Sequence, residues 1–245
     1  MKKILVRAPN WMGDGVMATP AISALRAHFF DAEITLLAKP VIATLFLHHP
    51  DIDRIIIYER PGKHAGFIGF LRLAAQLRRE RFSLAVLLKN AFESALLTAL
   101  AGIPKRVGYN TDFRGFLLTG TLQSKTAPVH QREAFLHIVR AMGASVTAQA
   151  PFLVLTEAER LAARSALESA GIASGTFVVG ISPGTAKGSA KAWLPDRFAT
   201  VADHFVKTHN AKVLILGGPN DLYAGEAVLK EMKSKAFNFI GKLSL

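Results

Sequence analysis

Short, continuous apolar runs alternate with helical patterns along the first half of the chain, and this alternation constrains the fold more than any other feature. Runs that are hydrophobic at consecutive positions are typical of strands covered on both faces. Such strands, separated by helices, predict a parallel sheet between two helical layers. The expected strands are residues 3–7, 33–37, 54–58, 83–88 and 106–108, and the expected helices lie near 14–29, 41–48, 65–81, 91–101 and 130–142.

The pattern begins again after a connecting segment, residues 143–155, that contains Pro151. Helices are expected at 157–170, 198–208 and 222–233, with strands at 176–181, 212–216 and 237–240. A doubly wound unit usually has about 5–6 strands, so the second unit is short of strands. We therefore predict an α/β fold with two Rossmann-like domains, residues 1–150 and 151–245, both with parallel sheets and the second incomplete.

The net charge is +12, and most of it lies in the first 150 residues. A basic surface predicts an anionic partner, which leaves nucleic acid, a membrane surface and a phosphorylated substrate open. Known nucleic-acid motifs are absent, so nucleic acid is not expected as a partner. The sequence has no cysteine and no histidine pattern of a metal site, so neither a thiolate metal site nor a bound metal is expected.

Ligands of open α/β sheets bind beyond the carboxyl ends of the strands, so the residues after each strand are the candidates. Most of these segments carry a cation, which predicts a positive cleft, and Asp14 adds a carboxylate near its floor. Asp14 has two interpretations that the sequence leaves open, a helix N-cap and a general base. The other candidates are Asn10, Trp11 and Gly13, then Lys39, then Arg60 and Lys63, then Lys89 and Asn90, and finally Tyr109 with Arg114 nearby.

A second cluster, residues 182–193, follows an expected strand and precedes a helix. Its glycines and hydroxyl residues are suited to present backbone N–H groups to a phosphate, with Lys187 and Lys191 adding charge. The alternative is a surface loop. Residues 217–221, Gly-Gly-Pro-Asn-Asp, are a further candidate for nucleotide contact. Residues 67–79 form a basic amphipathic stretch that fits a helix packed on its sheet better than a membrane-surface helix.

Two of these segments carry a resemblance. Ile-Leu-Val-Arg-Ala-Pro-Asn-Trp-Met-Gly-Asp at 4–14, followed by Met-Ala-Thr-Pro-Ala at 17–21, resembles the start of the ADP-heptose:lipopolysaccharide heptosyltransferases, glycosyltransferase family 9. The Asn-Trp form is most similar to the heptosyltransferase II branch. Ser-Pro-Gly-Thr at 182–185 with Ala-Lys-Ala-Trp-Leu-Pro at 190–195 resembles the second-domain motif of the family. In this chain Ala192 replaces the usual arginine, and Leu194 separates Trp193 from Pro195.

The resemblance implies a GT-B fold and an inverting, metal-independent glycosyltransferase without a cofactor. The first domain is expected to bind the acceptor, the inner core on lipid A, and the second to bind ADP-heptose. Asp14 corresponds to the base, and Lys191 to a lysine that contacts the donor diphosphate. A cytoplasmic enzyme is implied, with the inner-membrane surface open as a further partner. The expected donor-binding residues are Ser182, Gly184, Thr185, Lys191, Gly217 and Asp221.

Members of this family continue beyond the position that corresponds to Leu245, with further strands and an Asn-Asp-Ser-Gly type donor motif. The chain is therefore expected to be a fragment or a truncated product with weak or no transfer activity. The alternative function is a non-catalytic binding module for an acidic glycolipid or a membrane surface. Binding of ADP distinguishes the two, because the binding module is expected to have no affinity for the nucleotide.

Overall fold

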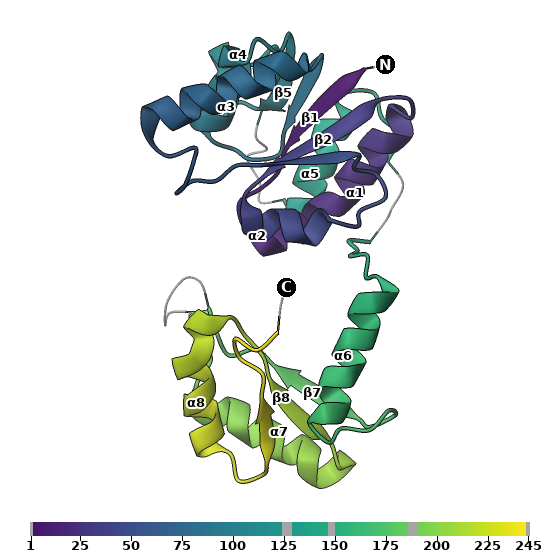
Figure 1. The fold of residues 1–245 in the computed structure, drawn as a ribbon, viewed down its shortest axis with the longest axis vertical. Helices are drawn as coiled ribbons and strands as arrows, with labels where there is room; N and C mark the ends of the chain where they lie inside the picture. Colours follow the sequence, from purple (N-terminus) through teal and green to yellow (C-terminus); the bar gives the residue numbers. More distant parts are fainter. Residues whose placement is uncertain (1, 124–128, 147–149, 186–190, 244–245) are drawn as a thin grey trace. The chain divides into compact units, whose positions relative to one another are not determined.

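A computed structural model describes residues 2–123, 129–146, 150–185 and 191–243. The chain divides into two compact units, which we call unit 1 (Met1–Leu155) and unit 2 (Thr156–Leu245). Figure 1 shows the fold coloured along the sequence. Among the described residues, no helix is both long and apolar enough to cross a membrane.

Unit 1 is built on a six-stranded, wholly parallel sheet in the order β3-β2-β1-β4-β5-β6. This is the strand order of a Rossmann unit. The five predicted strands are all present, and the sixth, β6, escaped prediction because its three residues form no apolar run. The strands are β1 (Lys3–Arg7), β2 (Glu33–Ala38), β3 (Arg54–Ile57), β4 (Leu84–Leu87), β5 (Lys105–Tyr109) and β6 (Gly120–Leu122).

Helices cover both faces of this sheet, as predicted (Figure 1). Alternate residues of β1 belong to the two cores: Ile4 and Val6 face the core with α1 and α5, and Leu5 faces the core with α3 and α4. The amphipathic stretch 67–79 is thus a packed helix, with Leu73 and Leu77 fully buried. The helices of unit 1 are α1 (Met12–His28), α2 (Pro40–Ala43), η1 (Thr44–Phe46), α3 (Gly66–Glu80), α4 (Phe92–Leu100), η2 (Gly115–Leu117) and α5 (Gln131–Arg140).

Helix α1 accommodates a proline in its interior, Pro20. Proline has no N–H, so the carbonyl of Val16 loses its usual helical partner. The hydroxyl of Thr19 donates to that carbonyl instead, over 2.9 Å. Thr19 also accepts a hydrogen bond from the backbone N–H of Phe152, which ties the end of unit 1 to its first helix.

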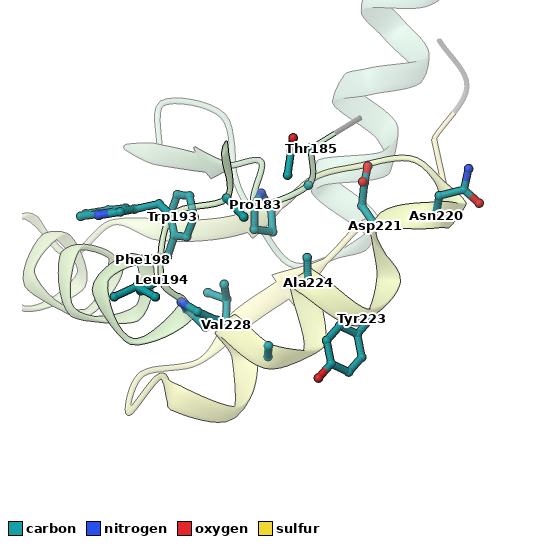
Figure 2. Close-up of a pocket in the computed structure, with 14 residues that line it drawn as sticks. Pro183, Thr185, Trp193, Leu194, Phe198, Asn220, Asp221, Tyr223, Ala224 and Val228 are labelled. Carbon is teal, nitrogen blue, oxygen red and sulfur yellow. The ribbon is translucent and has the colours of Figure 1, made fainter. Parts of the chain in front are cut away.

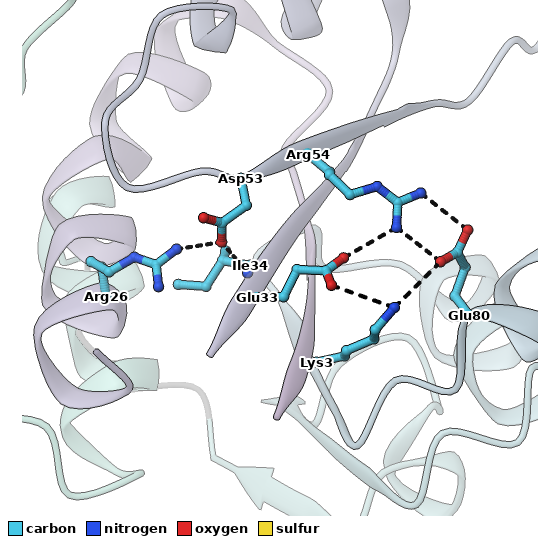
Figure 3. A network of polar contacts seen from close by, with 7 residues as sticks. All are labelled: Lys3, Arg26, Glu33, Ile34, Asp53, Arg54 and Glu80. Atoms are coloured by element: carbon cyan, nitrogen blue, oxygen red, sulfur yellow. Dashed lines mark hydrogen bonds and ion pairs between the residues drawn. The ribbon is translucent and has the colours of Figure 1, made fainter. Parts of the chain in front are cut away.

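The amino ends of β1, β2 and β3 carry a network of ion pairs (Figure 3). Arg54 donates to both carboxylate oxygens of Glu80, over 2.9 and 3.1 Å, and also to Glu33. Lys3 lies 3.4 Å from Glu33 and 3.9 Å from Glu80. These hydrogen bonds lower the pKa of Glu80, and they outweigh its partial burial. The network therefore fastens α3 to the edge of the sheet formed by the amino ends of these strands.

Unit 2 has a smaller parallel sheet in the order β7-β8-β9. Its core is small and includes Ala202, Val213, Ile215 and Val228. Helix α6 begins with the predicted Thr156 cap, completed by Glu159 into a reciprocal capping box. The elements are α6 (Glu157–Ser169), β7 (Val178–Ile181), α7 (Pro195–His209), β8 (Lys212–Ile215), η4 (Pro219–Asp221), α8 (Leu222–Glu231) and β9 (Ala236–Asn238).

Helices α7 and α1 begin earlier than predicted, by three and two residues. Helix α7 begins at Pro195 rather than at residue 198, since proline suits the first helical position. Helix α1 begins at Met12 after the N-cap Trp11. The N-cap interpretation of Asp14 is therefore wrong, because Asp14 lies within the first turn of the helix.

Candidate functional site

A pocket of about 290 Å³ lies beyond the carboxyl ends of β1 and β4 in unit 1. The residues after β1 form one wall, the residues after β4 form another, and α5 contributes Gln131 and Phe135. Five of the predicted residues meet here. The lining is Pro9, Asn10, Trp11, Asp14, Leu88, Lys89, Asn90, Gln131 and Phe135.

Asp14 is the one carboxylate among these lining residues. It lies in the first turn of α1 and is partly exposed. A carboxylate at the wall of a pocket is placed to accept a proton from a bound hydroxyl group.

Lys89 carries the positive charge of the pocket and pairs with Glu93 of α4, at 3.3 Å. Burial and the nearby charge of Arg7 lower the pKa of Lys89, while Glu93 raises it. Burial raises the pKa of Glu93, but Tyr58, Lys89 and Arg7 around it outweigh that effect and leave its pKa below the ordinary value. Arg60, a predicted site residue, lies 3.3 Å from the same carboxylate. Glu93 thus holds two of the predicted cations together.

The other predicted residues of unit 1 lie outside this pocket. Lys39 is the N-cap of α2, and its charge contributes to lowering the pKa of Lys89. Lys63 is exposed and pairs with Glu59 over 3.9 Å. Gly13 is exposed in the first turn of α1, with open space where a side chain would project.

Arg114 is not a cation of the cleft, because its side chain is fully buried. Its guanidinium donates to the carbonyls of Tyr109 and Lys89, over 2.8 and 2.7 Å. Burial lowers the pKa of Arg114. Tyr109 is buried as well, and its hydroxyl donates to the carbonyl of Ala134. Both residues therefore support the loops of the site from within.

A second pocket, of about 410 Å³, lies beyond β7 and β8 in unit 2 (Figure 2). Thr185 and Asp221 lie at one end, and Trp193, Leu194 and Phe198 lie at the other. The first end carries polar groups and the second is aromatic and apolar. The lining is Pro183, Gly184, Thr185, Ala192, Trp193, Leu194, Pro195, Phe198, Asn220, Asp221, Tyr223, Ala224, Ala227 and Val228.

Three of the predicted donor-binding residues, Gly184, Thr185 and Asp221, line this second pocket. Gly217 lies beside it, since a Cβ at that position would approach the Cβ of Asp221 to 2.9 Å. Ser182 is exposed at the end of β7. Lys191 is exposed and immediately precedes the lining residues Ala192 and Trp193. Lys187 lies outside the described residues.

Sequence reasoning missed Gln131 and Phe135 of the first pocket, and also Glu93, which pairs with the lining residue Lys89. Gln131 and Phe135 come from a helix far along the chain, and only the contact of α5 with α1 brings them to the strand ends. Glu93 lies within α4, beyond the loop that the strand-end rule covers. Its position four residues after Lys89 was the available signal, because it keeps a carboxylate within reach of that ammonium group.

The described residues include no group of three or more histidine, aspartate or glutamate side chains that could hold a metal ion. The side chains that line the two pockets offer the carboxylates of Asp14 and Asp221, the ammonium group of Lys89, the hydroxyls of Thr185 and Tyr223, and several amides.

Comparison with known proteins identifies the family. The model of glycosyltransferase family 9 (heptosyltransferase) matches residues 70–245. Lipooligosaccharide heptosyltransferase 2 of Campylobacter jejuni is 27% identical over 99% of this chain and 69% of its own length. Lipopolysaccharide heptosyltransferase 2 of Escherichia coli K12 is 28% identical over 95% of this chain and 68% of its own length.

The fold agrees with these relatives. The structure of ADP-heptose lps heptosyltransferase II of Escherichia coli aligns with a TM-score of 0.82, at 25% identity, over 99% of this chain and 73% of that one. A family 9 glycosyltransferase of Veillonella parvula aligns with a TM-score of 0.87, at 23% identity, over 99% of this chain and 70% of that one. The predicted α/β class of GT-B type is confirmed, with a second sheet smaller than the first. By its family match over residues 70–245, the chain belongs to glycosyltransferase family 9.

Proposed function

We propose that this glycosyltransferase moves a heptose from ADP-heptose to the inner core of lipopolysaccharide. The observation that carries the proposal is the pocket of unit 1, which places the carboxylate of Asp14 among three amides and an ammonium group. The names of the relatives support the donor and the acceptor: they are lipopolysaccharide and lipooligosaccharide heptosyltransferases, and the solved Escherichia coli relative is named for ADP-heptose.

In the proposed reaction, the acceptor hydroxyl lies in the pocket of unit 1. Its oxygen attacks the anomeric carbon as Asp14 takes its proton. The bond from that carbon to the diphosphate oxygen breaks, and ADP leaves with the electron pair. Attack from the face opposite the leaving group inverts the anomeric centre. The positions proposed to bind the acceptor are Asn10, Trp11, Gly13, Lys39, Arg60, Lys63, Lys89 and Asn90.

The donor is proposed to bind in the pocket of unit 2. Its aromatic end, with Trp193 and Phe198, suits the flat face of an adenine ring. Its polar end contains Gly184 and Thr185, where backbone N–H groups suit the diphosphate. Lys191 is proposed to neutralise the charge that develops on departing ADP. Ser182, Gly217 and Asp221 complete the proposed donor site.

We place the enzyme in the cytoplasm, at the inner-membrane surface where a lipid-linked acceptor would be met. Phe67 and Ile68 are each 74% exposed, and Phe113 is 92% exposed. They follow β3 and β5, at the same edge of the sheet as the pocket. Exposed apolar side chains in a basic unit suit an anionic lipid interface. Sedimentation with anionic vesicles tests this, and equal sedimentation of wild type and Phe113→Ser would contradict a role for this residue.

A transfer assay tests the function. The chain is incubated with ADP-heptose and a heptose-deficient lipopolysaccharide, and the product is analysed by mass and by the anomeric configuration in NMR. Heptose added with inversion, at equal rates with and without EDTA, is the expected result. ADP titrated by calorimetry separates the alternatives, because a non-catalytic binding module would show no affinity for the nucleotide.

A further inference from the structure

Two arginine side chains are fully buried beneath the pocket of unit 1, although arginine is rarely buried without a reason. Arg7 is the last residue of β1, and Arg114 precedes η2. Neither lines the pocket. Burial lowers the pKa of Arg7 to about 10, which still leaves it charged at neutral pH.

Each guanidinium fastens backbone segments at the carboxyl edge of the sheet. Arg7 donates through Nη1 to the carbonyls of Ala8 and Leu37, over 2.9 and 3.2 Å, and so links the ends of β1 and β2. Arg114 donates through Nη1 to the carbonyls of Lys89 and Ala91, over 2.7 and 3.3 Å, and so holds the turn between β4 and α4.

The remaining terminal nitrogen of each guanidinium goes to an asparagine that lines the pocket. Arg7 donates through Nη2 to Oδ1 of Asn10 over 3.2 Å. Arg114 donates through Nη2 to Oδ1 of Asn90 over 2.8 Å. The two pairs come from different parts of the chain, yet they use the same atoms in the same way.

This pairing fixes which end of each amide is available to a ligand. A guanidinium group has donors only, so the amide oxygen must face it and the NH₂ group must face away. Within the described part of the chain, neither the Asn10 nor the Asn90 amide nitrogen donates to a protein group. Two NH₂ groups therefore remain as donors at one pocket, beside the ammonium group of Lys89.

We propose that Arg7 and Arg114 are positioning residues that orient the amides of Asn10 and Asn90, so that the pocket recognises an anionic oxygen of the acceptor. This rests on the proposed function, in which unit 1 binds the acceptor. A carboxylate and a phosphate share the required chemistry, since both offer several acceptor oxygens and a negative charge. Asp14 then serves the neighbouring hydroxyl of the same acceptor.

Only an arginine meets this geometry. One planar group must donate to carbonyls on one side and to an amide oxygen on the other, which the single ammonium of lysine does not do. Gly108 leaves the space for it, because a Cβ there would lie 3.3 Å from Nη2 of Arg114.

The sharpest test is Asn90→Asp, with Asn10→Asp as its counterpart. Aspartate keeps an oxygen for the buried guanidinium but replaces the NH₂ donor with a second, negative oxygen. The melting temperature is expected to stay equal or rise, because the buried arginine gains a charged partner. The KM for the acceptor is expected to rise at least about tenfold, while the KM for the donor stays within about twofold. Arg114→Lys, a weaker orienting group, is expected to raise the acceptor KM with little change in donor KM.

Asn110→Asp is the matched control, because it adds the same charge after β5, at the same edge of the sheet but outside the pocket lining. Dephosphorylated and carboxyl-reduced acceptors identify which anion the pocket recognises. The wild type should bind one of these two acceptors more weakly than the native acceptor. Asn90→Asp should bind that modified acceptor and the native acceptor equally well. A stable Asn90→Asp or Asn10→Asp enzyme with the wild-type acceptor KM would overturn the proposal.

Direct binding keeps this inference separate from the proposed function. Inorganic phosphate and glucuronate are titrated by NMR into the wild type and Asn90→Asp. Binding of either anion to the wild type and its loss in the variant would support the oriented amides even if no heptose transfer occurred. If the wild type and the variant bound both anions equally, the proposal of oriented amides would be overturned, even if heptose transfer did occur.

Discussion

Gly184 and Asp221 are in direct contact at the ends of two adjacent strands, and a Cβ added to Gly184 would overlap the carboxylate of Asp221. That carboxylate also accepts a hydrogen bond from the N–H of Gly218 over 2.8 Å. The two loops of the proposed donor site therefore fit together only with glycine at 184.

Gly184→Ala is accordingly expected to displace Asp221 and to weaken ADP binding by about tenfold or more, which corresponds to at least about 1.4 kcal/mol. Calorimetric titration with ADP measures it. Gly180→Ala is the control, because its methyl would meet only the end of the Leu216 side chain, at 3.2 Å. The two variants binding ADP equally well would show that this contact has no role in the donor site.

Asp14→Asn is expected to lower kcat by about 10²–10⁴-fold, because the amide retains the shape of the side chain but cannot take the proton. ADP affinity should be unchanged, since the proposed donor site lies in unit 2. Single-turnover transfer assays measure the loss. Asp31→Asn, an exposed aspartate before β2, is the control. Turnover of Asp14→Asn within a few-fold of wild type would rule out the proposed base.

Lys191→Ala is expected to weaken ADP binding by about fivefold to tenfold, which is the range of one exposed charge-assisted contact, ~1–1.5 kcal/mol. The weakening should shrink at high salt, because exposed charges are screened. Calorimetry at two salt concentrations measures both effects. Lys207→Ala removes an equal charge from the last turn of α7 and should change nothing. Indistinguishable titrations of the two alanine variants would exclude Lys191 from the diphosphate site.

Gly69→Ala is expected to destabilise unit 1. Replacing glycine by alanine inside a helix usually stabilises a protein, by up to about 1 kcal/mol, so this expectation is the opposite of the usual one. A Cβ at this position would lie 2.5 Å from the carbonyl carbon of His64 and 2.8 Å from its Cα. Backbone cannot move aside cheaply, so a loss of about 1–3 kcal/mol is expected in urea unfolding. Gly13→Ala, with nothing within 4 Å, serves as the comparison for stability alone. A gain in stability at position 69 would contradict the packing.

The free energy of unfolding should depend on pH through Glu80 and its ion pairs. Its pKa in the folded protein is lowered, chiefly by hydrogen bonds from Arg54, so its contribution is present above the ordinary value of 4.5 and is lost as the pH falls through the folded value. Glu80→Gln should cost about 0.2–1 kcal/mol at pH 7, since the pair lies at the surface and is partly exposed. The difference from wild type should shrink as the pH falls from 7 through the lowered pKa of Glu80. A constant difference across that range would assign the effect to packing.

The sequence predicted the order of strands and helices well because both sheets are parallel and the strands of the larger sheet are mostly buried. Consecutive apolar residues such as Ile4, Leu5 and Val6 indicate a strand covered on both faces, and the helices between them can only be crossovers. Strand β6 could not be found this way, because Gly120 and Thr121 are held by pairing with β5 and not by apolar side chains.

The site was predictable where it lies next to strand ends in the sequence. Asn10, Asp14 and Lys89 were found because the carboxyl ends of β1 and β4 are neighbours in the sheet. The buried position of Arg114 was not predictable. An arginine that follows a strand gives the same sequence pattern whether its side chain faces solvent or backbone carbonyls. Only tertiary packing decides that, and it buries this one completely.

The ion pairs of Lys3, Glu33, Arg54 and Glu80 occupy one end of the strands whose other end shapes the pocket. A protein engineer can therefore treat the two ends as separate design regions. Charges at the amino end can be exchanged to raise heat tolerance, while the acceptor preference is diversified at the carboxyl end. The rigid strands between them keep the two sets of changes additive, since sites far apart without shared partners contribute independently.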